Sequence, residues 1–319
     1  WPSTSLQSFL TNAAAGDPVA RHAAVMFFSR IAEVNGTSTR THPEFQTLQK
    51  HPDPRVRLTL PLLDRRHGFA EAADLLDDTD PQVVLEAARA IHDVPIPKAA
   101  PRLAGLLESV SELQQRFPPD AWPSGVPFTR DEWLQFVLRR AVNVSLRLGQ
   151  PTNAAAIGQV AVRADLPEVL RIEAWDALGR WPRAERVDPV VGLVLTNWPQ
   201  PRPAWPVEPA QNAWRLAFSQ LDAATGTNVL VAAFRAGQSL QPPDWPGALE
   251  RWRDHADPGI RAEVARLSAN PASVSIAEWI QRARSGPLRD RQGALQTLSR
   301  SADPQVAPVL AAWLTAAAG

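Results

Sequence analysis

Short Asp-Pro steps recur along this chain, and each full copy opens a segment that carries an apolar stripe. An aliphatic residue follows the proline closely in every full copy, and a basic residue often comes after it. The full copies begin at Asp17, Asp53, Asp80, Asp257 and Asp303, and a looser copy is Asp165-Leu166-Pro167. A start pattern repeated in this way favours a stack of short helices over a globule built around one pocket.

The physical cause of the pattern is the shortage of hydrogen-bond partners at a helix N-terminus. The first amide groups of a helix have no acceptor within the helix, and an N-cap aspartate accepts hydrogen bonds from them. Proline suits the next position because no amide donor is needed there and its fixed φ is already helical. The aspartate charge is also favourable at the positive end of the helix dipole. We therefore expect each copy to begin a helix.

Apolar residues recur at helical spacing after these starts. The stripes are Val19, Ala23, Met26, Phe27 and Ile31; Val84, Ala87, Ala88 and Ile91; Leu170, Ala174, Ala177, Leu178 and Trp181; Ile260, Val264 and Leu267; and Val306, Val309, Leu310, Trp313 and Leu314. Further stripes between them predict partner helices, one of which ends at Gly149, a favourable C-cap. Because no alternating pattern extends beyond a few residues, the sequence predicts an all-α fold.

Paired helices in units of roughly 30 to 45 residues are typical of HEAT-type repeats, so we expect an α-solenoid of about seven or eight helix hairpins. The predicted organisation is an N-terminal array over 1–197 and a C-terminal array over 210–319. Residues 117–129 are rich in proline and glycine, and we expect an exposed excursion there. Residues 198–209 alternate proline with polar and aromatic residues, which predicts a polyproline-like strap or a hinge between the arrays.

Pro61 lies inside the segment that begins at Pro54. A proline in a helix interior removes one hydrogen bond and crowds the preceding turn, at a cost of about 3 kcal/mol. We expect a kink or a helix end near residues 59–61.

Six tryptophans directly precede proline, namely Trp1, Trp122, Trp181, Trp198, Trp205 and Trp245. A residue before proline is pushed out of the α region, so we expect these side chains at helix ends or in loops. Our interpretation is that they cover the hydrophobic seams between repeats, and the alternative is an aromatic binding surface.

Composition excludes whole classes of chemistry. Lys and Arg together number 33 and so do Asp and Glu, and a balanced charge argues against a nucleic-acid binder. The absence of cysteine rules out disulfides, a thiol nucleophile and a CxxCH haem attachment. The six histidines show no metal-ligand spacing, and His92 is interpreted as a packing or surface residue. We expect no catalytic residue, no cofactor, no metal and no transmembrane segment.

A solenoid presents one extended concave surface, on which polar helix residues face a partner. Helix phase gives the candidate contacts for a protein partner as Arg57, Glu86, Arg89, Arg171, Glu173, Arg261 and Glu263. The stretch 281–291 is the most basic local patch, and we interpret it as a solvated helix end and loop. The chain begins at Trp1 without a charged-then-apolar leader, so we expect a mature form or a fragment.

Three runs carry a family resemblance: residues 80–97, residues 139–157 and residues 161–181. They resemble the HEAT region of large bacterial PVC-type haem-binding proteins similar to glucose/sorbosone dehydrogenases, over about residues 17–195. In that family a β-propeller precedes the HEAT array and a cytochrome c domain often follows it. The chain departs from the family at Pro61 and in the Trp-Pro-rich segment, and it contains neither the propeller nor a haem motif.

The resemblance implies a docking or spacer module of an exported, periplasmic redox protein, whose partners are redox domains or subunits. A cytoplasmic location stays open. Two other functions are carried forward: a HEAT-like nucleic-acid-binding protein or enzyme, and an accessory subunit of a larger membrane-associated electron-transfer assembly. The first hypothesis is a non-catalytic HEAT-repeat scaffold that mediates protein–protein contact.

Overall fold

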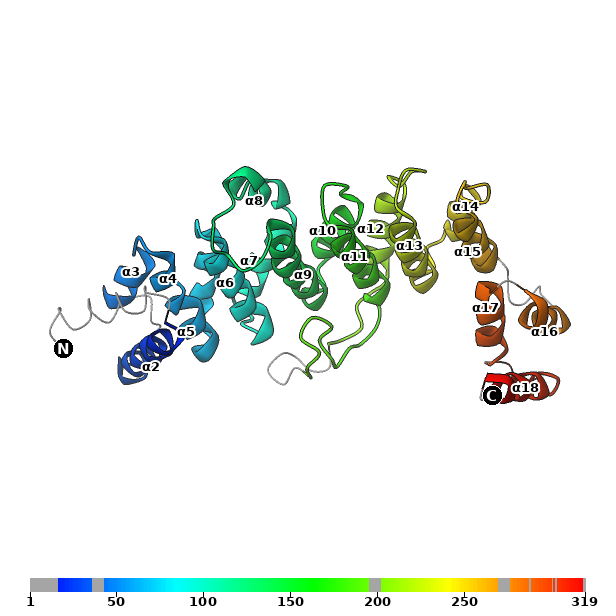
Figure 1. The fold of residues 1–319 in the computed structure, drawn as a ribbon, viewed down its shortest axis with the longest axis horizontal. Coiled ribbons are helices and arrows are strands. Elements are labelled where there is room, and N and C mark those ends of the chain that lie inside the picture. Colours follow the sequence, from blue (N-terminus) through cyan, green and yellow to red (C-terminus); the bar gives the residue numbers. More distant parts are fainter. Residues whose placement is uncertain are drawn as a thin grey trace. The chain divides into compact units, whose positions relative to one another are not determined.

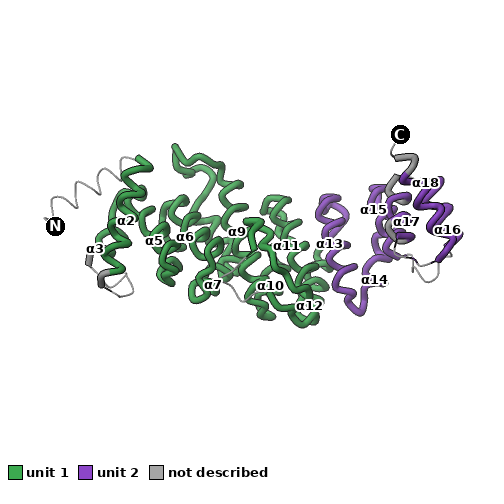
Figure 2. Tube along the Cα trace, turned by 90° about the horizontal axis from the view of Figure 1, so that it is seen from below, with its two compact units in different colours: residues 1–220 green, residues 221–319 purple. Residues whose placement is uncertain are grey.

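The protein is all-helical (Figure 1). The structure, a computed structural model, describes residues 17–35, 43–194, 202–268, 276–286, 288–299, 301 and 303–317. Within these residues the extended pairing consists of two isolated antiparallel bridges, Glu185 with Arg202 and Val187 with Val194. The chain divides into two compact units, residues 1–220 and residues 221–319 (Figure 2).

Unit 1 is built from α-helices and short 3₁₀ segments. They are α2 (Pro18–Asn35), α3 (Pro43–Gln49), α4 (Pro54–Arg57), α5 (Thr59–His67), η2 (Ala70–Asp77), α6 (Pro81–Asp93), α7 (Ala100–Ala104), η3 (Gly105–Leu107), α8 (Val110–Arg116), η4 (Pro119–Ala121), α9 (Arg130–Leu148), α10 (Pro151–Val162), α11 (Glu168–Arg180) and α12 (Glu208–Phe218).

Unit 1 packs as two rows of helices. One row runs α2, α5, α6, α9 and α11, each in contact with the next, and the other contains η2, α7, α10 and α12. Neighbours in the chain supply one helix to each row, as η2 with α6 and α10 with α11 do. Helices α10 and α11 can be followed in Figure 1. The core lies between the rows and includes the fully buried rings of Trp133, Trp175, Trp181 and Trp214.

Unit 2 contains α13 (Thr227–Leu240), α14 (Trp245–Glu250), α15 (Pro258–Ser268), α16 (Ile276–Ser285), α17 (Leu288–Leu298) and α18 (Val306–Ala317). Helix α15 contacts α13, α14 and α17. A small apolar cluster joins α16, α17 and the start of α18, and its buried members are Trp279, Ala283, Ala294, Leu298 and Val306.

The five full Asp-Pro copies all use the aspartate as predicted. In each, the Oδ1 atom accepts the backbone N–H of the residue two positions later, at 2.7–2.9 Å. At Asp303 the bond closes a turn, and α18 begins three residues later at Val306. The looser copy behaves differently: Pro167 is the N-cap of α11 without a side-chain hydrogen bond, and Asp165 is paired with Arg163 at 2.7 Å.

A second hydrogen bond recurs at these starts. The backbone N–H of the capping aspartate donates to the side chain two residues before it in four copies. The acceptors are Nδ1 of His51, Oδ1 of Asp78, Nδ1 of His255 and Oγ of Ser301, at 2.8–3.2 Å. We call this pair of bonds, one on each side of the aspartate, the Asp clasp. It holds the turn before each helix as well as its first amide groups.

Arginines four residues after the aspartate reinforce two of these turns. Nη1 of Arg57 donates to the carbonyls of His51 and Pro52, at 2.8 and 3.0 Å. Nη1 of Arg261 donates in the same way to the carbonyls of His255 and Ala256, at 2.6 and 2.8 Å. Both arginines therefore bend back over their own turn.

The helix end expected near Pro61 is confirmed. Helix α4 stops at Arg57, Leu58 intervenes, and α5 starts at Thr59, so no continuous helix runs from Pro54 to His67. Because α5 begins at Thr59, Pro61 lies in its first turn, where a backbone N–H has no acceptor within the helix.

The stripe expected on α2 is wrong in its phase. Val19 and Met26 are 75% and 41% exposed, whereas Ala24, Val25 and Phe28 are buried. Apolar residues occur on several sides of α2, so their spacing alone did not determine which side is buried. The stripes expected on α6 and α11 are buried in full. They were predicted correctly because polar residues mark the opposite face of each helix.

The segment 117–129 is non-helical apart from η4, but it is less exposed than expected. Phe117 is buried, and its ring and that of Trp122 contact Trp133 of α9 at centroid distances of 4.6 and 5.8 Å. Phe128 contacts Phe136 in the same way at 6.1 Å. Aromatic side chains thus fold this loop onto α9.

Part of the predicted strap, residues 198–201, lies outside the described residues. Residues 202–207 belong to unit 1, and Nε1 of Trp205 donates to the carbonyl of Leu146 in α9 at 2.8 Å. Nε1 of Trp181 donates to Pro206 at 3.0 Å, and Arg202 bonds the carbonyl of Arg180 at 3.0 Å. The compact units divide after Gln220, beyond this strap and beyond α12.

We predict that Asp80→Ala lowers the unfolding free energy by about 1 kcal/mol, because two amide groups of α6 lose their acceptor. Burial raises the pKa of the Asp80 carboxyl, so its surroundings do not favour the charge itself. Asp80→Asn keeps the oxygen and should cost much less. Urea unfolding of the full chain measures both, and equal losses would show that the cap hydrogen bonds are unimportant.

The ring of Trp205 lies directly on Gly149, the left-handed C-cap of α9 (φ 67°). A Cβ atom there would fall 2.1 Å from the ring, whereas one on Gly68, another left-handed C-cap, would meet nothing within 4 Å. Gly68→Ala should therefore cost about 1 kcal/mol from the backbone alone. We expect Gly149→Ala to cost at least twice as much and to change the tryptophan fluorescence; equal costs would contradict the packing.

Candidate binding surface

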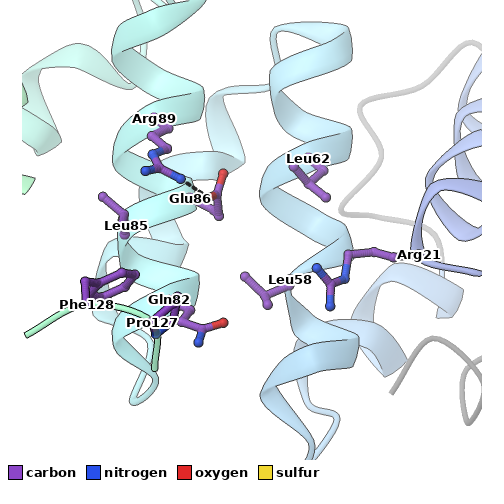
Figure 3. A pocket seen from close by; sticks show the side chains of 9 residues that line it. All are labelled: Arg21, Leu58, Leu62, Gln82, Leu85, Glu86, Arg89, Pro127 and Phe128. Atoms are coloured by element: carbon purple, nitrogen blue, oxygen red, sulfur yellow. Dashed lines mark hydrogen bonds and ion pairs between the residues drawn. The ribbon is translucent and has the colours of Figure 1, made fainter. Parts of the chain in front are cut away.

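An open hollow of about 220 Å³ lies between α2, α5 and α6 at the edge of the 117–129 loop (Figure 3). Its lining residues are Arg21, Leu58, Leu62, Gln82, Leu85, Glu86, Arg89, Pro127 and Phe128. Leucines and the Phe128 ring form its apolar part, and charged side chains stand around it. The hollow exists because α5 and α6 pack on each other while the loop reaches α6 from the side of α9.

Two of the predicted partner contacts line this hollow. Glu86 and Arg89 lie one turn apart on α6, and Nη1 of Arg89 is 2.5 Å from Oε1 of Glu86. Their side chains are 23% and 35% exposed, so a bound molecule can reach both. Arg21 of α2 is the residue that sequence reasoning missed here. Its Nε atom is buried and has no hydrogen-bond partner.

The remaining predicted contacts do not gather with these two. Arg57 is buried and forms a two-bond pair with Asp78, with both N–O distances 2.8 Å, and Arg261 bonds its own turn. Glu173 pairs with Arg139 at 2.8 Å, and burial raises the pKa of its carboxyl despite that pair.

Arg171 is half-buried and donates to the carbonyl of Ala161 at 3.4 Å. Burial lowers the pKa of its guanidinium. Glu263 pairs with Arg266 on α15 at 2.7 Å, in the other compact unit. The predicted contacts are therefore spread over the fold, and only the α6 pair lines the hollow of Figure 3.

A cluster of charged side chains in unit 1 is buried and surrounds His92 at the end of α6. Nδ1 of His92 is 2.7 Å from Oδ1 of Asp93, so this nitrogen carries a proton that the carboxylate accepts. Nε2 lies 3.1 Å from Nη2 of Arg147. Oδ1 of Asn143 lies 3.0 Å from the same Nε2 atom.

Two ion pairs complete this His92 cluster. Arg140 donates to both oxygens of Asp93, at 2.9 and 3.2 Å. Arg147 pairs with Asp188, whose Oδ1 accepts the backbone N–H groups of Val190 and Val191. Two arginines thus balance two aspartates, and the pairs tie α6 and α9 to the loop before the strap.

The cluster holds both carboxyl groups strongly ionised. Burial by itself would raise the pKa of Asp93, but hydrogen bonds from His92 and Arg140 outweigh it and hold the pKa at about 2. Burial would also raise the pKa of Asp188, but the interactions with His92 and Arg147 outweigh it and hold that pKa well below its ordinary value.

His92 is fully buried and Asp188 is 1% exposed, so a substrate has no access to these groups. A histidine between two acids resembles catalytic machinery in composition, but here every polar atom of the ring is bonded within the fold. We assign the cluster to positioning the loop at residues 182–194. His92 was interpreted as a packing or surface residue; it is fully buried, and the polar cluster around it was not foreseen.

Among the described residues no group of His, Cys, Asp and Glu side chains is arranged to hold a metal ion. No helix in the described ranges is long and apolar enough to cross a membrane. Comparison of the chain with protein-family models, curated proteins and solved structures finds no match.

The His92 cluster predicts a specific acid sensitivity. Because the folded-state pKa of Asp93 is lowered from 3.8 to about 2, its stabilisation is present above the unfolded value and is lost as pH falls through the folded one. Asp93→Asn should therefore cost about 2 kcal/mol of unfolding free energy at pH 7, and the difference from the native protein should shrink between about pH 4 and pH 2.

Asp120→Asn, at an exposed carboxylate in η4, is the matched control and should leave the unfolding free energy unchanged. Denaturant titrations from pH 7 to pH 2 give the comparison. A pH-independent difference for Asp93→Asn would show that the ion pairs do not stabilise the fold.

Proposed function

We propose that the chain is a non-catalytic HEAT-type repeat scaffold that mediates protein–protein contact. The observation that supports this most strongly is the Asp clasp, which opens helices by the same hydrogen bonds in both compact units. Repetition of the same N-terminal hydrogen bonds is expected of a chain built from related helix hairpins. Roughly 40 residues per hairpin corresponds to about seven or eight repeats.

The two-row packing of unit 1 adds to the proposal. A single helix hairpin cannot bury its apolar face, so each depends on the hairpins before and after it. The contacts of α6 and α9 with helices close to them in the chain follow this rule. Such an architecture offers long solvated surfaces, which suit recognition of another protein better than chemistry on a small substrate.

The family resemblance extends this proposal to a role and a place. It favours a docking or spacer module of an exported, periplasmic redox protein, with redox domains or subunits as partners. The gene's flanking sequence tests this part directly. A propeller coded upstream and a CxxCH motif downstream would support it, and a gene without either would remove the argument for the periplasm.

The contact surface itself is tested by a binding screen against a display library of the source organism's proteins. We expect a protein partner whose capture falls at least tenfold when Glu86→Arg and Arg89→Glu are combined, because both charges of the α6 pair are reversed. The matched control reverses the exposed pair Arg30 and Glu33 on α2, which lies outside the lining.

A DNA shift assay at low salt accompanies the screen. Retention of DNA with no protein captured would overturn the scaffold in favour of nucleic-acid binding. Capture that is indifferent to the reversed pair would keep the scaffold and move its contact surface elsewhere.

A further inference from the structure

The hollow on α6 carries an unbalanced positive charge. The guanidinium groups of Arg21 and Arg89 and the carboxylate of Glu86 are its charged groups, which leaves one positive charge. Glu86 is already bonded to Arg89 at 2.5 Å. The leftover charge therefore belongs to Arg21, whose guanidinium extends from α2 toward Leu58 (Figure 3).

Arg21 also lacks a hydrogen-bond partner where one is needed. Its Nε atom is buried and unbonded, and no ion pair to Arg21 is found within the described part of the chain. A buried donor on a charged group is costly to leave without an acceptor. A carboxylate that enters the hollow and pairs with the guanidinium group of Arg21 would neutralise its charge in one contact.

The apolar part of the hollow limits what else the entering molecule contains. Leu58 and Leu85 are buried at 5% and 1% exposure, and Leu62 and Phe128 are half-buried beside them. A volume of about 220 Å³ is below the roughly 300–1,000 Å³ of sites for small-molecule ligands. It suits one or two side chains of a peptide better than a whole cofactor.

From this geometry we propose that the hollow binds a protein segment that presents one carboxylate next to a bulky aliphatic or aromatic side chain. The carboxylate bonds Arg21, and the apolar side chain lies against Leu58, Leu85 and Phe128. One negative charge matches the one uncompensated positive charge, whereas a phosphate would bring about two. The proposal rests on the scaffold function and names the chemistry of its partner.

The test is a selection of random seven-residue peptides on the full chain, followed by synthesis of the most enriched peptide and its Glu→Gln or Asp→Asn form. We expect enrichment of an acidic residue adjacent to Leu, Ile or Phe. The amide form should bind the native protein at least about tenfold more weakly, and added salt should weaken the acidic form.

Two variants assign the contact. Arg21→Gln should weaken the acidic peptide by at least about tenfold and abolish its advantage over the amide form, while Arg21→Lys, which keeps the charge, should preserve that advantage. Arg30→Gln, on the exposed face of the same helix, should leave both affinities within about twofold. Melting curves establish that each variant is folded.

Peptides that bind Arg21→Gln as well as the native protein, or that show no acidic preference, would overturn this inference while leaving a peptide-binding scaffold in place. Failure to enrich any peptide, with a protein partner captured in the library screen, would also overturn it. A native dimer that Arg21→Gln converts to a monomer would assign the hollow to a second copy of the chain instead.

Discussion

The fold depends on how the helices after the Asp-Pro steps begin. An aspartate oxygen holds an amide group of the first turn, and in four copies the aspartate's own N–H is held by the residue two positions before it. This arrangement fixes the direction in which a helix leaves its turn, and that direction decides which apolar face meets the previous helix. Short helices have little stability alone, so packing and caps must supply it.

Sequence reasoning recovered the elements that follow from local chemistry. The Asp-Pro starts, the break before Pro61 and the left-handed Gly149 each depend on residues within one turn of each other. The buried stripes of α6 and α11 also followed, because polar residues mark their outer faces. On α2, whose own apolar residues occur on several sides, the spacing predicted the wrong buried face.

The features that depend on distant partners were out of reach. Nothing adjacent to His92 indicates Asn143, Arg147 or Asp188, which lie 51 to 96 positions later in the numbering yet meet it in the fold. The hollow is equally non-local, because α2, α6 and the 117–129 loop each supply part of it. Helix phase found Glu86 and Arg89 but not Arg21, whose importance comes from the acceptor that its buried Nε lacks. One local pattern could have been found: His-x-Asp-Pro-x-(Val or Ile)-Arg, at residues 51–57 and 255–261.

Asp78 performs two tasks at once. It accepts the backbone N–H of Asp80, the capping residue of its own copy, and N–H groups on Nε and Nη2 of Arg57, which belongs to the preceding copy. These neighbours are therefore not interchangeable parts. Removing one of these two hairpins, or exchanging their order, would leave the guanidinium of Arg57 buried without its carboxylate partner. Duplication or loss of hairpins in this stretch is therefore constrained to changes that keep both partners together.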